Sequence, residues 1–312
     1  MGAVMNPSPT QAREALDFPC WMQERLVRTE RALEQWVGVD APAGLGEAMR
    51  YAVLDGGKRL RPLLVWAAAE AVQGLDEAAV RAGCAVELIH AYSLVHDDMP
   101  CMDNDVLRRG KPTVHVRFGE AAALLAGDAL QALAFELLVP DAGQAAGMPD
   151  ALQARLSRLL ARAAGAQGMA GGQAIDLASV GLQLDEARLR EMHRLKTGAL
   201  LQASVLMGAA CNPHVDASAW QALTEYGQAL GVAFQVVDDI LDVVADSATL
   251  GKTAGKDAAN DKPTYVSLMG LEQARAHADG LCAMAHAALA RSGLADTQAL
   301  AALADMVVRR TH

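Results

Sequence analysis

The chain has 312 residues, of which 52% are hydrophobic, 21% are charged and only 4% are aromatic. This composition excludes intrinsic disorder, and an apolar content carried mainly by Ala, Leu and Val favours packed helices over sheets. The formal net charge of −10 argues against general attraction to nucleic acid or to an anionic membrane. Any anionic ligand must therefore be held by local cations or by a metal.

Helical segments separated by Gly and Pro follow one another along the chain. No linker divides them, so we expect residues 1–312 to form a single domain, with residues 1–16 as a flexible N-terminus. Residues 113–118 alternate like a strand but have no partner, and they are interpreted as an extended loop. The fold class predicted is all-α, with helices at 17–37, 44–54, 62–72, 77–95, 120–138, 150–165, 168–179, 185–207 and 217–244 and more towards the end.

The cysteines and the apolar stretches give no sign of export or of membrane insertion. The richest apolar stretch, 121–139, contains Asp128 and Glu136 and is followed by Pro140, so no transmembrane helix is expected. An odd number of scattered cysteines without a CxxC pair argues against a disulfide framework and against a thiolate zinc site. We expect a cytoplasmic protein with free thiols at Cys20, Cys84, Cys101, Cys211 and Cys282.

The first acidic cluster is the sequence DDMPCMD at 97–103, which follows an apolar helix. Two unit charges about 4 Å apart repel by roughly 4 kcal/mol at an effective dielectric of 20, so clustered carboxylates favour a cation such as Mg²⁺. On an unbroken helix Asp97 and Asp103 would point about 120° apart. We expect Pro100 to break the helix and return Asp103 towards Asp97. Taken alone, the cluster is equally compatible with a solvated acidic helix end.

The second acidic cluster is DDILD at 238–242, and it follows the strongly apolar run 231–237. Asp238 and Asp242 are four residues apart and share a helix face. Burying carboxylates among apolar side chains is costly without a partner, which again favours a metal.

Basic residues lie near both clusters. Lys58, Arg59 and Arg61 follow two glycines and precede Pro62, so their side chains and the free amides of a helix start could hold a phosphate. There is no Walker loop and no GxGxxG, which leaves the common nucleotide-binding motifs unsupported. Further basic residues are Arg108, Arg109, Lys111, Lys196, Lys252, Lys256 and Lys262.

Seven motifs in this order resemble those of the trans-isoprenyl diphosphate synthases: GGKRLRP, HAYSLVHDDMPCMDND, LRRGKPT, GMAGGQAID, KTG, FQVVDDILD, and GKTAGKD with DKPTY after it. The lengthened first motif is most similar to that of the bacterial farnesyl diphosphate synthases. The resemblance implies a single helical domain around a central apolar cavity, commonly a homodimer. It also implies Mg²⁺-dependent condensation of isopentenyl diphosphate with allylic diphosphates, by ionisation, addition and deprotonation.

The resemblance also assigns roles to individual residues. Asp97, Asp103 and Asp238, helped by Asp98 and more weakly by Asp242, would hold Mg²⁺, with three ions bound beside substrate. Gln173 and Asp176 would support the water ligands of the metal, and Thr197 and Gln235 would lie near the reacting carbon. The allylic diphosphate would contact Arg108, Lys196, Lys252 and Lys262, and isopentenyl diphosphate would contact Lys58, Arg61, His90 and Arg109.

Product length is expected to depend on Tyr92 and Ser93. On the helix that ends near Asp97, Ser93 lies one turn below the aspartate and Tyr92 about 7.5 Å down the axis. In the family, an aromatic residue at this position commonly stops growth at fifteen carbons, which implies farnesyl diphosphate. The alternatives are a geranyl or geranylgeranyl diphosphate synthase, a terpene cyclase, which would not need the second diphosphate site, and a non-catalytic partner subunit, which would have lost an acidic cluster.

Overall fold

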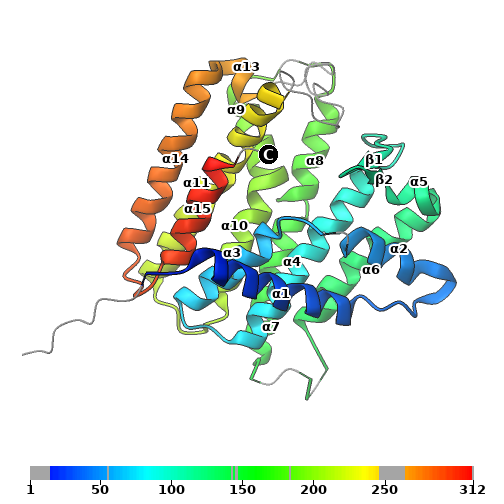
Figure 1. The fold of residues 1–312 in the computed structure, drawn as a ribbon, viewed down its shortest axis with the longest axis horizontal. Coiled ribbons are helices and arrows are strands. Elements are labelled where there is room, and N and C mark those ends of the chain that lie inside the picture. Colours follow the sequence, from blue (N-terminus) through cyan, green and yellow to red (C-terminus); the bar gives the residue numbers. More distant parts are fainter. Residues whose placement is uncertain are drawn as a thin grey trace, which may run out of the picture.

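The structure is a computed structural model that describes residues 15–54, 56–141, 143–144, 147–182, 184–245 and 264–310. These residues are mostly helical, which confirms the all-α prediction (Figure 1). The strands among them are β1 (Leu107–Arg108) and β2 (Lys111–Pro112), a two-residue antiparallel pair. Most of the expected flexible N-terminus, residues 1–16, lies outside the described residues, and so do Lys252, Lys256 and Lys262.

The first half of the chain surrounds one long helix, α4. This helix is buried almost all round because it carries apolar residues on every face, and it contacts α3, α6 and α10. In Figure 1 it runs through the middle of the molecule. The elements here are α1 (Phe18–Trp36), η1 (Pro42–Gly44), α2 (Leu45–Val53), α3 (Leu60–Ala71), α4 (Asp76–Asp97), α5 (Val114–Phe118) and α6 (Glu120–Leu138).

The second half adds a group of helices around α11, which packs against α10 and α14. A π-helical turn, η2, joins α9 to α10, where the sequence predicted one regular helix over 185–207. The elements are α7 (Asp150–Ala164), α8 (Met169–Ala178), α9 (Glu186–His193), η2 (Arg194–Gly198), α10 (Ala199–Ala210), α11 (Ala217–Ala245), α13 (Tyr265–Met269), α14 (Leu271–Arg291) and α15 (Gln298–Arg309).

The prediction of an extended loop at 113–118 is wrong. Residues Val114–Phe118 form the short helix α5, with Val114 buried, and Thr113 is the extended residue that precedes it. Six residues are too few to separate a period of 2 from a single helical turn. The extended residues that do pair lie just upstream. There β1 pairs with β2, and Gly110, with φ +77°, lies in the turn between them.

Glycines allow close helix packing, and two of them lie around α3, α4, α6 and α10. A Cβ on Gly208 of α10 would lie 2.3 Å from the Val65 carbonyl oxygen of α3, and one on Gly127 of α6 would lie 2.0 Å from His96 Nε2. His96 also hydrogen-bonds the Leu124 carbonyl at 3.1 Å. These contacts hold α6 against the end of α4, where the first acidic cluster begins.

Two helices, α4 and α6, are long and apolar enough to span a membrane by length and composition, which the sequence analysis did not anticipate. Of the apolar window in α4, 72% is buried inside the protein, as in the core helix of a globular domain. The corresponding share in α6 is 39%, and Leu124 and Leu125 are exposed on it. All five cysteines are free, as predicted.

Candidate active site

The first acidic cluster lies where α4 ends. The helix stops at Asp97, and after a turn through Pro100 the Asp103 backbone N–H donates to the Asp97 carbonyl oxygen at 2.8 Å. The two carboxylates are close enough to interact electrostatically. The structure therefore brings Asp103 back to Asp97, as the break expected at Pro100 requires.

The paired aspartates of this cluster have different surroundings. Asp98 is only 2% exposed, and its two oxygens accept hydrogen bonds from Arg108 at 2.6 and 2.8 Å. Asp97 is less buried, and burial raises its pKa to about 6, while the charge of Lys196 opposes this shift and Asp103 adds to it. A cation bound at Asp97 would stabilise the ionised carboxylate.

The second acidic cluster lies on α11 and shows the same division. Asp239 is 4% exposed and accepts hydrogen bonds from the Gln235 side chain at 2.9 Å and from the Tyr265 backbone N–H at 2.7 Å. The side chain of Asp238 is 41% exposed, and its Oδ1 atom lies 2.6 Å from the Nη2 atom of Arg310. Asp242 is one turn further along α11 and is exposed.

The π-helical turn η2 carries Lys196 and Thr197. Lys196 Nζ lies 2.6 Å from Asp176 Oδ2 on α8, and Thr197 Oγ1 donates to Gln235 Oε1 at 3.2 Å. Single π-helical turns within α-helices are frequent at functional sites. This turn links the two acidic clusters, because Lys196 acts electrostatically on Asp97 while Thr197 contacts the residue that holds Asp239.

Helix α8 supplies the two residues expected to support metal-bound water. A Cβ on Gly172 would lie 2.1 Å from the Lys196 backbone nitrogen, so α8 packs directly on η2. Both amide atoms of Gln173 are buried and lack a hydrogen-bond partner among the described residues. Buried amides are normally hydrogen-bonded, so Gln173 is suited to a bound ligand or water.

Three of the residues predicted to bind isopentenyl diphosphate interact electrostatically, because the charges of Arg61 and Arg109 act on His90. The fourth, Lys58, is exposed in the segment before α3. Arg109 donates to the Gly56 carbonyl at 2.5 Å and reaches so close to Gly57 that a Cβ there would lie 2.8 Å from Nη1. Burial lowers the pKa of Arg61, and its Nε has no hydrogen-bond partner among the described residues. Burial, with the charges of Arg61 and Arg109, also lowers the pKa of His90 well below its usual value. This concentration of positive charge suits an anion.

Arg59, within the same basic motif, has a different role. It is 5% exposed and pairs with Glu30 at 2.6 Å and Glu87 at 2.7 Å, while also donating to the Val53 carbonyl. Arg59 therefore anchors the start of α3 inside the protein. Glu87, which Arg59 contacts through Oε1, also acts electrostatically on Arg61.

Tyr92 and Ser93 lie in the turns of α4 below Asp97. The Tyr92 ring packs edge-on against His96 with centroids 5.7 Å apart, and burial raises the pKa of Tyr92. The Ser93 hydroxyl donates to the His90 carbonyl oxygen at 2.8 Å. Tyr92 is electrostatically coupled to Asp97, which places it near the acidic end of the helix.

Three residues at this site were not identified from the sequence as functional candidates. Asp239 was part of a recognised motif, but the roles implied by the resemblance went to Asp238 and Asp242 and left Asp239 without one. His193 stacks on Tyr265 with ring centroids 5.5 Å apart, and burial lowers its pKa to about 4. Arg310 packs its guanidinium 3.9 Å from the centroid of the Phe234 ring. His193 precedes the KTG motif by three residues and Arg310 lies outside every motif, so neither position carries a sequence signal for such contacts.

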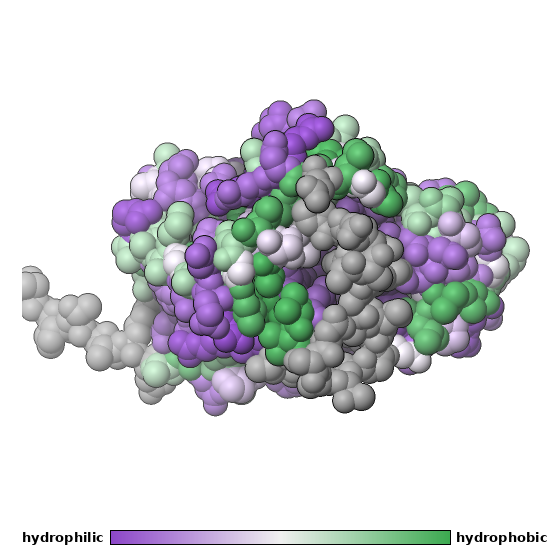
Figure 2. All heavy atoms as spheres, turned by 90° about the horizontal axis from the view of Figure 1, so that it is seen from above, coloured by the Kyte–Doolittle hydropathy of each residue, from purple (hydrophilic) through white to green (hydrophobic). Residues whose placement is uncertain are grey.

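The donor set fits magnesium. Asp97, Asp103 and Asp238 offer carboxylate oxygens, the hard ligands that Mg²⁺ prefers. Burial raises the pKa of Asp97, and a bound cation would offset this cost of ionisation. Figure 2 looks onto the end of the molecule that carries α13 and shows hydrophilic side chains on both sides of a hydrophobic strip.

A family model described as polyprenyl synthetase matches residues 42–299. The chain belongs to the polyprenyl synthetase family. It is 44% identical to the farnesyl diphosphate synthase of Haemophilus influenzae, over 93% of this chain and 97% of that protein. It is 42% identical to the chloroplastic geranylgeranyl pyrophosphate synthase of Capsicum annuum, over 97% and 81% of the two chains. The apo structure of an FPP/GFPP synthase from Zymomonas mobilis aligns with a TM-score of 0.82 at 40% identity, over 94% and 99%.

Membership in the polyprenyl synthetase family confirms the resemblance drawn from the motifs. The protein is a prenyltransferase that makes short-chain prenyl diphosphates, and its family uses Mg²⁺. The identities to farnesyl and geranylgeranyl enzymes are similar, so they do not fix the length of the product.

Proposed function

We propose that this prenyltransferase is a farnesyl diphosphate synthase, which joins isopentenyl diphosphate first to dimethylallyl diphosphate and then to geranyl diphosphate. The observation that carries the proposal is the presence of two binding regions of opposite character. Carboxylates and Lys196 form one region, and a group rich in cations, Arg61, Arg109 and His90, forms the other. Two diphosphates can then bind differently within one molecule.

In this proposal the allylic diphosphate binds between the acidic clusters. Mg²⁺, three ions with substrate bound, would neutralise the diphosphate as it leaves. Lys196 and Arg108 add positive charge from the protein, with Lys252 and Lys262 assigned to the same task by the family resemblance. Lys196 is positioned by Asp176, and Arg108 by Asp98.

Isopentenyl diphosphate is assigned to the cation-rich group without metal. Arg61 and Arg109 would pair with its phosphates, and the exposed Lys58 would reach them from the loop before α3. The depressed pKa of His90 keeps its imidazole neutral at pH 7, so it would act as a hydrogen-bonding group. The orphaned Nε of Arg61 supports this assignment, since a bound phosphate oxygen would satisfy it.

The reaction then needs no protein nucleophile. The allylic carbon–oxygen bond breaks, and the oxygen atoms of Thr197 and Gln235 are assigned to stabilise the delocalised allylic cation. The double bond of isopentenyl diphosphate attacks this cation. A proton is lost to the departed diphosphate, which restores a double bond in the product. Apolar surroundings would keep out water that could otherwise capture the cation.

Tyr92 supports farnesyl diphosphate as the product of this protein. The alternative, geranylgeranyl diphosphate, is the product named for a relative of similar identity, the Capsicum annuum enzyme. Tyr92 lies on α4 below Asp97, where a chain anchored by its diphosphate at the metals would extend, and it is braced by His96. A bulky, braced ring at this depth is suited to stop growth at C15. Ser93 above it is small and leaves space.

The test is to incubate the purified protein with Mg²⁺, dimethylallyl diphosphate and excess labelled isopentenyl diphosphate, and to separate the dephosphorylated products by chromatography. We expect mainly C15 from the wild type, C20 or longer from Tyr92→Ala, and C15 from the matched control Tyr92→Phe, which keeps the ring. A wild-type protein that makes mainly C20 would contradict the farnesyl assignment. An active Tyr92→Ala variant that still stops at C15 would assign the limit to another residue.

We also propose that the protein is a cytoplasmic homodimer. The support for the dimer is α6, which is strongly apolar yet only 39% buried, with Leu124 and Leu125 on one exposed face. A second copy would cover this face. Light scattering should give twice the monomer mass, and Leu125→Asp should give monomers. A membrane-bound wild type in cell fractionation would contradict the proposed location.

A further inference from the structure

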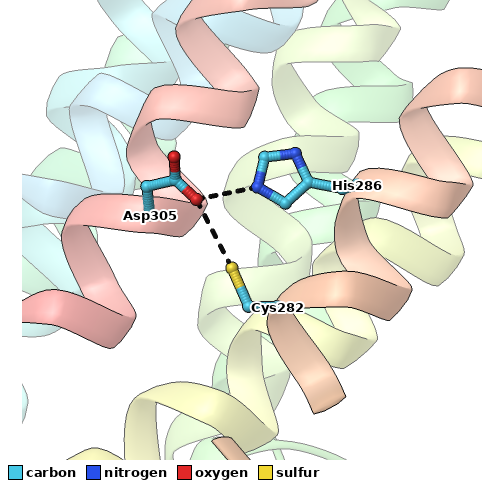
Figure 3. A group of neighbouring side chains, drawn as sticks. All are labelled: Cys282, His286 and Asp305. Atoms are coloured by element: carbon cyan, nitrogen blue, oxygen red, sulfur yellow. Dashed lines mark hydrogen bonds and ion pairs between the residues drawn. The ribbon is translucent and has the colours of Figure 1, made fainter. Parts of the chain in front are cut away.

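A second group of metal-binding side chains lies between α14 and α15. Figure 3 shows Cys282 and His286 projecting from α14 towards Asp305 on α15. Asp305 Oδ1 lies 2.8 Å from His286 Nε2 and 3.6 Å from Cys282 Sγ. One ligand atom from each residue lies within 4.8 Å of the other two. The three residues belong neither to the acidic clusters nor to the cation-rich group.

Helix geometry creates this arrangement. Cys282 and His286 are four residues apart, so their side chains lie one above the other on one face of α14. Helix α15 packs against α14 and places Asp305 opposite them. Because the sequence separates Asp305 from the other two by about twenty residues, no short motif reveals the cluster. A site with a single cysteine is compatible with scattered cysteines that lack a CxxC pair, although these argued against a thiolate zinc site.

Two of the three distances between ligand atoms are close to those that a tetrahedral ion requires. With zinc–sulfur bonds of about 2.3 Å and zinc–nitrogen or zinc–oxygen bonds of about 2.0–2.1 Å, ligand atoms lie roughly 3.3–3.6 Å apart. The sulfur–oxygen distance of 3.6 Å already fits. The nitrogen–oxygen distance of 2.8 Å must open by about 0.5 Å, which a small rotation of the Asp305 side chain achieves.

The chemistry selects a different metal from that of the active site. A thiolate and an imidazole favour Zn²⁺ and related transition ions, whereas carboxylates alone favour Mg²⁺. One thiolate and one carboxylate exactly balance a charge of +2, leaving the imidazole neutral. The side chains of His286 and Asp305 are 40% and 38% exposed, so an ion can enter and water can complete its coordination.

We propose that Cys282, His286 and Asp305 form a binding site for a divalent ion of the zinc class, which clips α15 to α14. Binding releases the thiol proton of Cys282 to solvent, moves the ring proton of His286 from Nε2 to Nδ1, and replaces the hydrogen bond between His286 and Asp305 with two metal bonds. The ion would hold α15, and Arg310, which directly follows this helix, contacts Asp238. The site is a structural clip and takes no part in the condensation.

The test uses the purified full-length protein, stripped with a chelator and held in excess Mg²⁺ so that the carboxylate clusters are occupied. Zn²⁺ is titrated by calorimetry, and Co²⁺ is added separately to reveal a thiolate-to-metal absorption band. We expect one tight Zn²⁺ per chain and a thiolate band. Cys282→Ser, His286→Gln and Asp305→Asn should each weaken binding by more than about tenfold, and only Cys282→Ser should remove the band entirely.

The matched control is Cys20→Ser, which removes an exposed thiol on α1 and should change neither result. Circular dichroism and prenyltransferase activity in Mg²⁺ should be retained by all four variants, which separates this proposal from the proposed function. Absence of stoichiometric Zn²⁺ binding, or binding that survives Cys282→Ser unchanged, would overturn the site. In either case the trio is a hydrogen-bonded contact between two helices.

Discussion

The two acidic clusters reach the same arrangement by different routes. In the first, helix α4 ends and the chain turns back through Pro100, whereas in the second, Asp238 and Asp242 are aligned by an unbroken helix. In both, the second aspartate of the pair is buried and held by protein donors. Asp98 is held by Arg108, and Asp239 by Gln235 and Tyr265. The first aspartate of each pair is more exposed, so we propose that each motif divides into a metal ligand and an anchor.

Each of the more exposed aspartates also faces a cation from a distant part of the chain. The charge of Lys196 acts on Asp97, and Arg310 contacts Asp238 directly. The negative charge of these two aspartates is thus partly balanced by one basic side chain each, without metal. A Mg²⁺–diphosphate complex could displace that side chain or bind beside it. The comparison predicts that losing a ligand aspartate affects turnover, whereas losing an anchor affects folding.

The largest expected effect comes from removing a ligand aspartate. Asp97→Ala or Asp238→Ala should lower turnover by at least about a thousandfold, or about 4 kcal/mol, because charge that develops on the leaving diphosphate loses its metal. Steady-state assays in Mg²⁺ measure this loss, and circular dichroism checks folding. A folded variant that keeps more than about a tenth of wild-type turnover would show that the replaced aspartate is not a metal ligand.

The next effect separates the two diphosphate regions. Arg61→Ala should raise KM for isopentenyl diphosphate by about a hundredfold, with a much smaller change for the allylic substrate. Lys196→Ala should show the reverse pattern. Equal changes in both KM values from both variants would mean that the regions do not divide the substrates as proposed.

Replacing an anchor aspartate should destabilise the protein. Asp98→Asn leaves Arg108 without its carboxylate, and Asp239→Asn weakens the hydrogen bonds from Gln235 and Tyr265, so each should lower the free energy of unfolding by about 1–3 kcal/mol. Thermal unfolding without metal gives this value. Asp97→Asn and Asp238→Asn are the matched controls. If they destabilise as much as the anchor variants, the division between ligand and anchor is wrong.

The smallest effect concerns pH. The pKa of Asp97 is about 6 in the folded protein, above the 3.8 of an exposed aspartate, so the folded state binds the proton more tightly. Its contribution to stability is complete below about pH 4 and is lost as pH rises through about 6. In chelator, Asp97→Asn should therefore become more stable than wild type by about 1–2 kcal/mol above pH 6, and should match it near pH 4. A constant difference across this range would contradict the raised pKa.

Local sequence rules predicted much of the fold and the site. Apolar periodicity and Gly and Pro positions located most helices, and Pro100 predicted the return of Asp103 because proline has a direct steric effect on the backbone. The same rules failed at 113–118, where a run of six residues fits both a strand and a helical turn. They also cannot distinguish Arg59, buried against Glu87, from Arg61 two residues later.

Contacts between distant segments were beyond prediction from residue patterns. The pairing of Arg310 with Asp238, and of Asp305 with Cys282 and His286, depends on how α15 packs against its neighbours. The family resemblance carried the assignment of roles, because motif order along the chain substitutes for the missing spatial information. It named Asp238 as a metal ligand and gave Asp239 no role, and only the structure shows that Asp239 is held by Gln235 and Tyr265.

The most direct test of the central claim, that both clusters bind one metal-bound diphosphate, is a double-mutant cycle on binding. Calorimetry would measure the affinity for inorganic diphosphate in Mg²⁺ for wild type, Asp97→Asn, Asp238→Asn and the double variant. If the clusters share one ligand, each single variant should lose most of the affinity and the double variant should lose far less than the sum of the two losses. Additive losses, or tight binding that persists in either single variant, would show that the clusters act separately and would contradict the account.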